Sequence, residues 1–359
     1  MKLTAQIKLQ PSPEKYELLK ATLEEANGAC NWISEQAFAE KVFGQFSLHK
    51  LVYHSARERF ALSAQMVVRA IAKVADSYKV SKKKQRGFKK YGAIPYDSRI
   101  LSFDLHKKQV SIWTLAGRER IPFVCGDRAW ELLQGDRGEA DLCFIRGAFY
   151  LFVSCDIESP EPIDVDGVLG VDMGIVNVAT DSDGNQYSGA HMLGIRGRRF
   201  RQRRRLQVKG TRSARRVLKR LSGKERRFAK QENHRISKEI VDRAKHTGRG
   251  IALEDLQGIR ERVRVQRSQR RNLHSWSFHQ LQQFILYKAE LAGVPVIFLN
   301  PAYSSQTCSC CGHVAKSNRK SQSSFECQSC GYADHADTNA ARNLSSWAAC
   351  NSAVQLVPF

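Results

Sequence analysis

The sequence predicts an α+β protein with more than one domain, and three observations support this prediction. Residues 100–156 alternate apolar and polar side chains in short runs separated by turns, which is typical of antiparallel strands. Residues 12–77 place apolar side chains at helical spacing. From residue 167 onward, buried strands alternate with amphipathic helices. We therefore expect an antiparallel β-barrel or sheet with inserted helices, followed by an α/β domain.

The N-terminal part begins with a strand that leads directly into the inserted helices. The segment LTAQIKLQ alternates in the manner of a strand. Ser12 and Pro13 then mark a helix start, with Ser12 as the N-cap and Pro13 at the first helical position. The basic segment KVSKKKQRGFKKYG interleaves Phe88 and Tyr91 with lysines. It is equally consistent with nucleic-acid contact and with a solvated loop.

The C-terminal part follows the Pro- and acid-rich segment ESPEPIDVDG, which predicts a linker. VLGVDMGIVNVAT predicts one buried strand, and DSDGNQYS a hairpin turn. In residues 196–227 roughly half of the side chains are Lys or Arg, while apolar residues keep helical spacing. We expect one or two long helices with a basic face there. GIALEDLQG, SFHQLQQFILYKAELAG and VPVIFLNP then predict a strand, an amphipathic helix and another strand.

The charge of the chain narrows the class of its partners. The sequence contains 58 Lys and Arg against 35 Asp and Glu, a formal net charge of +23. A clustered basic excess of this size usually marks a polyanionic partner, with nucleic acid expected before an anionic membrane surface. No apolar run approaches the roughly 18 residues of a membrane span, and the N-terminus lacks the apolar core of a signal peptide. We expect a soluble cytoplasmic protein.

Four of the ten cysteines have the spacing of a zinc ribbon. Cys308 and Cys311 form one C-x₂-C pair, and Cys327 and Cys330 form a second pair fifteen residues later. This spacing fits four thiolates around one structural Zn²⁺. Cys310 offers an alternative thiol in the first pair. The glycine after the second cysteine of each pair favours Cys308 and Cys311, because each knuckle then turns tightly at that glycine.

Three acidic residues lie where the pattern predicts core elements. Asp172 lies within an apolar strand, Glu254 ends the strand GIALED, and Asp337 begins the final helix. A buried carboxylate is costly unless positive charge compensates it, and a salt bridge would explain any one of them. Three on distinct core elements instead indicate a site for two Mg²⁺ ions, which prefer carboxylate oxygens. Two such ions can activate a water and stabilise the leaving 3′ oxygen, so we predict phosphodiester hydrolysis.

At these residues the sequence resembles a known family. GVDMGI, ALEDL and DHADTNAARN resemble the three catalytic segments of a RuvC-type nuclease domain with the RNase H-like fold. YKAELAGVPVIFLNPAYSSQTCSCCG and FECQSCGYADHADTNAARN are similar to the end of TnpB proteins, which are transposon-encoded RNA-guided nucleases related to type V CRISPR effectors. The close resemblance covers about residues 168–347. The N-terminal half agrees in layout only.

The resemblance implies a domain division and a role for each cluster. The implied domains are a wedge-like β-barrel (1–10 and 96–158), a helical recognition lobe (11–95), a linker (159–166), a RuvC-like nuclease domain (167–300 and 335–359) and a zinc ribbon (301–334). Asp172, Glu254 and Asp337 become the metal-binding catalytic acids. The ribbon is expected to brace the third acid and to flank the substrate cleft. The nearby acids Asp181, Asp255 and Asp334 are expected to support turns or the site.

The resemblance also implies partners and a location near DNA. The implied partners are a guide RNA from the transposon end and a double-stranded target DNA beside a short adjacent motif. One RuvC site would cut both DNA strands. The basic helices would neutralise duplex phosphates without reading sequence. The arginines expected to do so are Arg203, Arg204, Arg205, Arg215 and Arg216. A basic helix that binds nucleic acid nonspecifically would look the same in sequence. The implied location is the prokaryotic nucleoid.

Three alternative functions stay open at this point. The first is a catalytically silent, guided DNA-binding repressor or transposition regulator, against which the intact acids argue. The second is a transposase or integrase that joins strands on the same fold. The position of the ribbon between the second and third acids argues against it, as does the lack of an evident helix-turn-helix. The third is a compact type V CRISPR effector, against which the short length of the chain weighs slightly.

Overall fold

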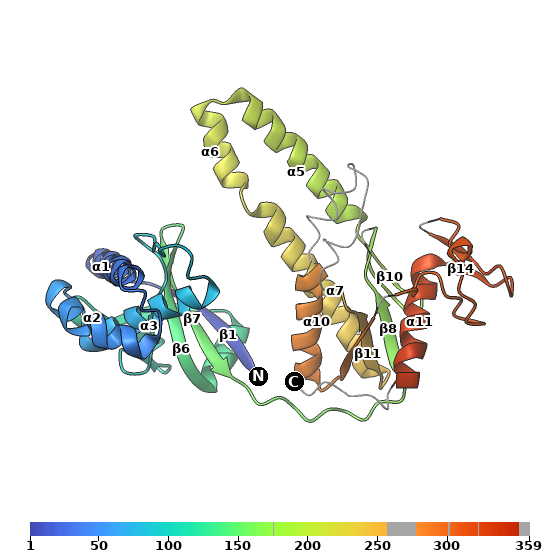
Figure 1. The fold of residues 1–359 in the computed structure, drawn as a ribbon, viewed down its shortest axis with the longest axis horizontal. Helices are drawn as coiled ribbons and strands as arrows, with labels where there is room; N and C mark the ends of the chain where they lie inside the picture. Colours follow the sequence, from blue (N-terminus) through green and yellow to red (C-terminus); the bar gives the residue numbers. More distant parts are fainter. Residues whose placement is uncertain (175, 257–277, 301, 322, 352–359) are drawn as a thin grey trace. The chain divides into compact units, whose positions relative to one another are not determined.

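The computed structural model divides into two compact units, Met1–Glu158 and Ser159–Phe359. It describes all residues except 175, 257–277, 301, 322 and 352–359 (Figure 1). Among the described residues, no helix combines the length and the apolar composition needed to cross a bilayer.

The first unit is built on a seven-stranded antiparallel sheet in the order β2-β6-β7-β1-β5-β4-β3. Its strands are β1 (Lys2–Leu9), β2 (Ile94–Tyr96), β3 (Leu101–Asp104), β4 (Gln109–Thr114), β5 (Gly117–Val124), β6 (Asp136–Ile145) and β7 (Ala148–Asp156). The edge strands β2 and β3 are consecutive in the chain, so the short connection at residues 97–100 draws the two edges together. The Tyr96 hydroxyl donates to the Trp113 carbonyl of β4 at 2.9 Å. The sheet is therefore a nearly closed barrel.

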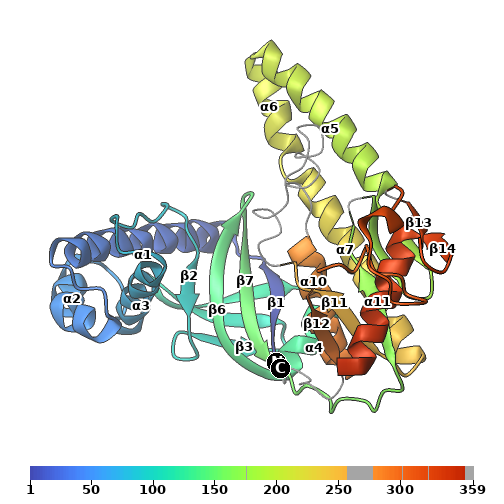
Figure 2. The same cartoon turned by 45° about the vertical axis from the view of Figure 1, so that its right-hand side comes forward.

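Three helices are inserted between β1 and β2, as the sequence predicts (Figure 2). They are α1 (Pro13–Ala39), α2 (Gln45–Arg59) and α3 (Ala64–Val80). The Ser12 hydroxyl accepts a hydrogen bond from the Lys15 backbone N–H at 3.4 Å, which caps α1. The sequence did not reveal β2 or the short helix α4 (Asp127–Gln134). Both are too short to establish a period, and α4 buries only two leucines.

The aromatic residues of the basic segment pack against the core of the first unit. Phe88 exchanges two hydrogen bonds with the Asn31 amide, at 2.7 and 3.0 Å, through its backbone N–H and carbonyl. The Tyr91 ring lies edge-on to Phe144, with the two centroids 5.6 Å apart. Both rings are partly buried against the core, while the lysines around them stay exposed. The two rings thus fix the loop, and the lysines face solvent.

The second unit contains a five-stranded sheet in the order β10-β9-β8-β11-β12. The strands are β8 (Val168–Asp172), β9 (Asn177–Asp181), β10 (Gln186–Ser188), β11 (Gly250–Glu254) and β12 (Val296–Leu299). Strands β8, β11 and β12 are parallel, and β9 and β10 are antiparallel to their neighbours. The prediction of one strand in VLGVDMGIVNVAT was wrong, since this segment forms two, β8 and β9. Both strands lie inside the sheet and are buried, so no polar alternation marks the turn between them.

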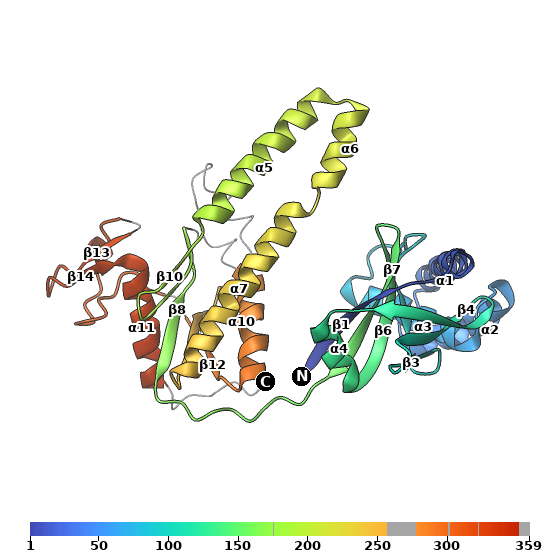
Figure 3. The ribbon, with the colours of Figure 1, turned by 180° about the vertical axis from the view of Figure 1, so that it is seen from behind.

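Helices cover both faces of this sheet (Figures 1 and 3). The helices packed on the sheet are α7 (Lys224–His246), α10 (Phe278–Ala292) and α11 (Ala336–Asn351), whereas α5 (Ala190–Lys209) and α6 (Arg212–Leu221) project away from it. Leu169 and Val171 of β8 join a hydrophobic core with α7 and α10. Val168, from the opposite face of β8, packs with Leu344 and Ala348 of α11. Helix α11 therefore lies on the face opposite α7 and α10.

The basic region forms three helices, so the prediction of one or two was wrong. Helices α5 and α6 make a hairpin, and α7 continues from it toward the sheet (Figure 3). Gly210 ends α5 with φ +61°, and Gly223 precedes α7 with φ +76°. The Thr211 hydroxyl caps α6 by accepting from the Ala214 N–H at 3.1 Å. The repeated arginines keep the helical pattern across both breaks, which hides these glycine stops in the sequence.

Gly170 permits a close contact between β8 and α11. A Cβ atom at this position would lie 2.0 Å from the Ala341 carbonyl oxygen and 2.6 Å from the Ser345 backbone nitrogen. The Ser345 hydroxyl also donates to the Val168 carbonyl at 2.6 Å. Only glycine fits here without moving the helix away from the strand.

We expect Gly170→Ala to destabilise the second unit by about 1–3 kcal/mol or more, because one methyl group must push two backbone segments apart. A lowered melting temperature would report this. Gly194→Ala in α5 is the matched control, since its Cβ would meet no atom within 4 Å. In a helix interior that change should be neutral or stabilising by up to about 1 kcal/mol. Equal melting of the two variants would contradict the close-packing argument.

Candidate active site and cysteine cluster

Three carboxylates come from three core elements of the second unit to one edge of its sheet. Asp172 is the last residue of β8, and Glu254 is the last residue of the adjacent parallel strand β11. The two strands are in register up to Val171 and Leu253, so both acids leave the sheet at the same end. Asp337 lies in the first turn of α11, which packs on β8. The fold thus brings the three acids predicted from the sequence into one neighbourhood.

The environment of Asp172 and Glu254 opposes the ionisation of both side chains. Desolvation raises the pKa of Asp172 well above its usual value, and the charges of Glu254 and Asp337 raise it further. Desolvation also raises the pKa of Glu254. Several carboxyl groups with little water around them form a region of strong negative potential. A bound cation would relieve it.

Hydrogen bonds hold the carboxylates in place. The Asn177 amide of β9 donates to Asp337 Oδ2 at 3.1 Å. The Ser304 hydroxyl donates to Glu254 Oε1 at 2.8 Å, and the Gln282 amide of α10 donates to the Glu254 carbonyl at 2.7 Å. One oxygen each of Glu254 and Asp337 is thereby oriented by a neutral donor.

Arg319 adds a positive group to the site, and the sequence analysis missed it. This residue follows the short 3₁₀ helix η1 (Lys316–Asn318), between the two cysteine pairs. Its Nη2 lies 3.8 Å from Asp337 Oδ1, and its charge acts to lower the pKa of Asp172 and Glu254. In the sequence, Arg319 is one of several cations in a polar stretch, so nothing local distinguishes it.

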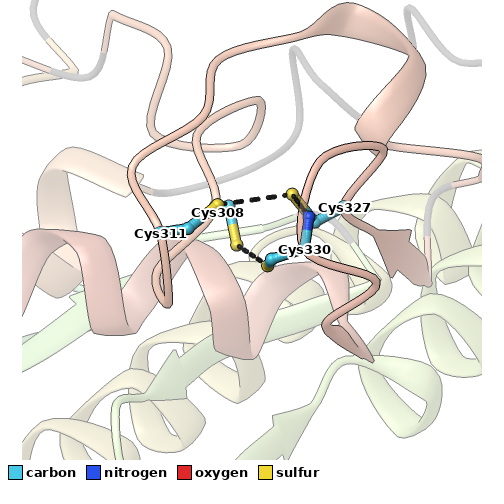
Figure 4. A group of neighbouring side chains, drawn as sticks. All are labelled: Cys308, Cys311, Cys327 and Cys330. Atoms are coloured by element: carbon cyan, nitrogen blue, oxygen red, sulfur yellow. Dashed lines mark hydrogen bonds between the residues drawn. The ribbon is translucent and has the colours of Figure 1, made fainter.

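The four cysteines of the two C-x₂-C pairs form a cluster whose size fits tetrahedral coordination of one metal ion (Figure 4). The sulfur atoms of Cys308, Cys311, Cys327 and Cys330 all lie within 4.8 Å of one another, and none is in a disulfide. Two of the separations are 3.7 Å (Cys308 to Cys330) and 3.6 Å (Cys311 to Cys327). Four sulfurs about 2.3 Å from one Zn²⁺ would be separated by about 3.8 Å, so this group fits a zinc ion.

The choice of ligands in the first pair follows from the structure. Cys310 is exposed and lies outside the cluster. The glycines after Cys311 and Cys330 have φ of +74° and +72°, the left-handed conformation that tight knuckles require. Backbone N–H groups of Cys330 and Ser329 donate toward the Cys327 sulfur and lower the pKa of that thiol to about 6. The cluster thus favours at least one thiolate at neutral pH.

Within the described residues this is the only group of three or more His, Cys, Asp or Glu whose ligand atoms all lie within 4.8 Å of one another. The three carboxylates are not all that close together.

Hydrogen bonds join the cysteine cluster to the helix that carries Asp337. The Asn339 side chain of α11 accepts from the Ser309 N–H at 2.9 Å and donates to the Thr307 carbonyl at 2.8 Å. The Asn343 amide donates to the Thr307 and Ser304 carbonyls at 2.7 and 2.8 Å. On the other side, strand β14 (Ala333–His335), which pairs with β13 (Ser324–Glu326), leads directly into α11. The cluster therefore holds the start of this helix.

The remaining predicted residues lie apart from this centre or in structural contacts. Asp181 is the fully buried last residue of β9, and both of its carboxylate oxygens accept from the Asn185 side-chain amide at 2.9 Å. Asp334 pairs with Arg342 at 2.6 Å. Asp255 donates its backbone N–H to the Leu299 carbonyl at 2.8 Å.

The five predicted arginines are all exposed. They are Arg203, Arg204 and Arg205 on α5 and Arg215 and Arg216 on α6. Arg203 pairs with Glu225 of α7 at 2.9 Å, so part of its charge is used within the basic helices.

Comparison with known proteins places these features among characterised relatives. Residues 278–344, which include α10 and the cysteine cluster, match the family model "Cas12f1-like, TNB domain". The CRISPR-associated endodeoxyribonuclease Cas12f1 of Sulfoacidibacillus thermotolerans is 28% identical over 367 aligned positions, covering 86% of this chain and 82% of that protein.

Two further relatives match over shorter regions. A TnpB-like protein of Methanocaldococcus jannaschii is 35% identical over 129 residues, covering 36% of this chain and 46% of that protein. The putative RNA-guided DNA endonuclease InsQ of Escherichia coli is 28% identical over 218 residues, covering 55% and 53%. These alignments thus span about half of each of the two relatives.

A solved structure shares the fold. The cryo-EM structure of a Cas12f1–sgRNA–target DNA complex matches 93% of this chain and 83% of its own chain, with a TM-score of 0.67 and 18% identity. At this identity the match shows a common multidomain α+β fold.

Proposed function

Because this chain is related in sequence and fold to the TnpB proteins and the compact type V effectors, we propose that it is an RNA-guided DNA endonuclease. The observation that carries the proposal is the convergence of Asp172, Glu254 and Asp337 at one edge of the second sheet. The named relatives include endodeoxyribonucleases and a putative RNA-guided DNA endonuclease, which favours cleavage over a silent repressor or a strand-joining enzyme.

We assign the second unit to a RuvC-type nuclease domain with the RNase H-like fold. Its sheet has the order β10-β9-β8-β11-β12, which is 3-2-1-4-5 when the strands of the unit are counted along the chain. Strands β11 and β12 are parallel to β8. We assign the barrel to the wedge-like domain and α1–α3 to the recognition lobe, with the boundaries expected from the sequence.

The carboxylates fit the role of ligands to two Mg²⁺ ions. They are hard oxygen donors, and the pKa values of Asp172 and Glu254 are raised by desolvation, which reflects the cost of leaving these charges uncompensated. Bound Mg²⁺ would supply an activated water and charge stabilisation at the leaving oxygen. The contribution of the chain is positional: Asn177 and Ser304 orient two of the acids. We assign one structural Zn²⁺ to the four clustered cysteines, whose spacing it fits.

We assign Arg319 the role of binding the scissile phosphate of the DNA. Its guanidinium approaches the acids from the segment between the cysteine pairs, where a phosphodiester held beside the carboxylates would need positive donors. We expect Arg319→Ala to slow DNA cleavage about 10²- to 10³-fold, the usual cost of removing one donor to developing charge.

Single-turnover cleavage rates would measure this effect. Lys316→Ala is the matched control, because Lys316 is an exposed cation in the same segment. If both variants lost activity equally, Arg319 would contribute only to the general positive charge of the segment.

The proposed partners are a guide RNA from a transposon end and a double-stranded target DNA matched to it. The exposed arginines of α5 and α6 would contact duplex phosphates without reading sequence. Target choice would then depend on base pairing with the guide, next to a short adjacent motif.

The test begins with RNA that co-purifies with the full chain expressed from its own locus. That RNA is sequenced, a matching DNA duplex is prepared, and cleavage is followed with Mg²⁺ and with a chelator. We expect one discrete RNA and Mg²⁺-dependent cutting of the matched duplex alone. A discrete RNA without cutting would indicate a guided repressor. Guide-independent nicking or joining would indicate a transposase-like enzyme.

A further inference from the structure

A pocket in the first unit lies outside every site described above. It has a volume of about 520 Å³ and lies between α1, the end of α2 and the start of the loop that follows α3. Its lining includes Trp32, Arg59, Phe60, Gln85 and Arg86. A volume in this range suits a small organic group.

The wall of this pocket offers flat surfaces for stacking. The ring centroids of Trp32 and Phe60 are 6.0 Å apart, with an interplanar angle of 57°. The Arg59 guanidinium lies 5.6 Å from the Trp32 centroid and 5.9 Å from that of Phe60. Both rings are partly exposed, and Arg59 is exposed. Aromatic faces and guanidinium planes are the surfaces on which proteins stack unpaired bases.

The pocket also offers polar groups that are held in place. Arg86 is fixed through its backbone, since its N–H donates to the Tyr78 hydroxyl at 3.2 Å and its carbonyl accepts from the Ser34 hydroxyl at 2.7 Å. Its Nε is buried and has no hydrogen-bond partner among the described residues. The guanidinium is also held by its Nη2, which donates to the Ser81 carbonyl at 2.8 Å. The exposed Glu35 carboxylate adds hydrogen-bond acceptors, and the exposed Gln85 amide adds both an acceptor and a donor.

The surroundings of the pocket are strongly basic. Lys82, Lys83 and Lys84 precede Gln85, and Lys89 and Lys90 follow Gly87 at the other end of the same short segment. All five lysines are exposed. A ligand with a flat ring and a nearby anionic group matches the stacking surfaces of the pocket and the lysines around it. An apolar peptide fits less well, because it would bury the charged side chains of Arg86 and Glu35 without giving them hydrogen-bond partners.

We propose that this pocket holds one unpaired nucleobase of the bound nucleic acid, stacked against Trp32 or Phe60 with its phosphate near the lysines. The base must be unpaired, because neighbouring bases cover the faces of a base within a duplex. The inference rests on the proposed function only in requiring a nucleic-acid partner. RNA and DNA share the chemistry, so the experiment distinguishes them.

The first test maps photocrosslinks in the full chain. The protein is isolated with its RNA from cells grown with 4-thiouridine, and separately mixed with single-stranded target DNA carrying 5-iododeoxyuridine. After irradiation and digestion, mass spectrometry should find a nucleotide adduct on the peptide containing Trp32 or on residues 85–87. An RNA adduct would assign the base to the guide, and a DNA adduct to the target. Adducts confined to α5 and α6 would overturn the pocket and keep the nucleic-acid partner. No adduct anywhere would overturn both proposals.

The second test compares two exposed cations of α2. Arg59→Gln removes a pocket wall, and Lys50→Gln removes the same charge from the same helix outside the pocket. At one salt concentration we expect Arg59→Gln to weaken binding of the crosslinked strand about fivefold or more, and Lys50→Gln less than about twofold. Trp32→Phe should bind more tightly than Trp32→Leu, because it keeps a stacking face. Equal losses for the two charge variants would overturn the proposal.

Discussion

We expect Asp172→Asn to reduce the proposed guided DNA cleavage by about 10³-fold or more, while binding of the proposed guide and target should remain. The substitution keeps the shape of the side chain and removes the carboxylate whose pKa is raised by desolvation and by the charges of Glu254 and Asp337. Loss of that charge removes one of the three carboxylate ligands proposed for the Mg²⁺ ions, and 10³-fold corresponds to about 4 kcal/mol of transition-state stabilisation. Single-turnover cleavage and a gel-shift assay of the same preparation measure the two properties.

The same variant carries a stability signature that tests the electrostatic argument separately. The folded-state pKa of Asp172 is raised above its unfolded value of about 3.9, so the metal-free protein loses stability as pH rises from about 4 toward the folded pKa. Asn does not ionise. Asp172→Asn should therefore melt at a higher temperature than the wild type at neutral pH in chelator, and this advantage should vanish in acid.

Asp166→Asn is the matched control for both measurements. Asp166 is an exposed acid shortly before β8, so its loss changes the net charge equally. It should cleave normally and should lack the melting advantage. Normal cleavage by Asp172→Asn would show that Asp172 is not a catalytic residue. A lower melting temperature in chelator would show that Asp172 has a structural role that outweighs the repulsion.

Removing two sulfurs from the cysteine cluster should have the second largest effect. In Cys308→Ser/Cys327→Ser, bound zinc should fall from about one ion per chain to almost none, because a structural zinc site needs its thiolates. Cleavage should fall by about 10²-fold or more, since the segment between the pairs carries Arg319 and the cluster holds the start of α11. Metal analysis and cleavage rates on the same samples provide the measurement.

Cys310→Ser supplies the control within the same knuckle. Cys310 is exposed and outside the cluster, so this variant should keep its zinc and its activity. Zinc loss in Cys310→Ser equal to that of the double variant would show that the ligand set is different. Full cleavage by a zinc-free double variant would show that the cluster does not support the acids.

Functional residues could be predicted from the sequence where they depart from the pattern of their neighbours. Asp172 is a carboxylate in an apolar strand, and the clustered cysteines repeat a known ligand spacing. The structure brings Asp172 close to Glu254 and Asp337 and gathers the four sulfurs. The catalytic role of the acids stays a prediction.

Residues whose importance depends on tertiary position could not be selected. Asn177, Ser304 and Arg319 are ordinary polar residues until folding places them beside the acids. The same limit applies to secondary structure. The turn between β8 and β9 joins two buried strands, and the glycine stops after α5 and α6 lie within a continuous basic helical pattern. In each case the local pattern continues through the boundary.

The contact of β8 with α11 through Gly170 has a consequence for newly made protein. Asp172 and Asp337 lie 165 residues apart in the chain, so a ribosome adding about 5–20 residues per second makes β8 roughly ten to thirty seconds before α11 begins. During that interval a nascent chain already displays its barrel and its basic helices but has no completed group of three acids. Under the proposed function, nucleic acid could therefore bind the growing polypeptide before the site that cuts it is complete. Cutting would then begin only after α11 has been made.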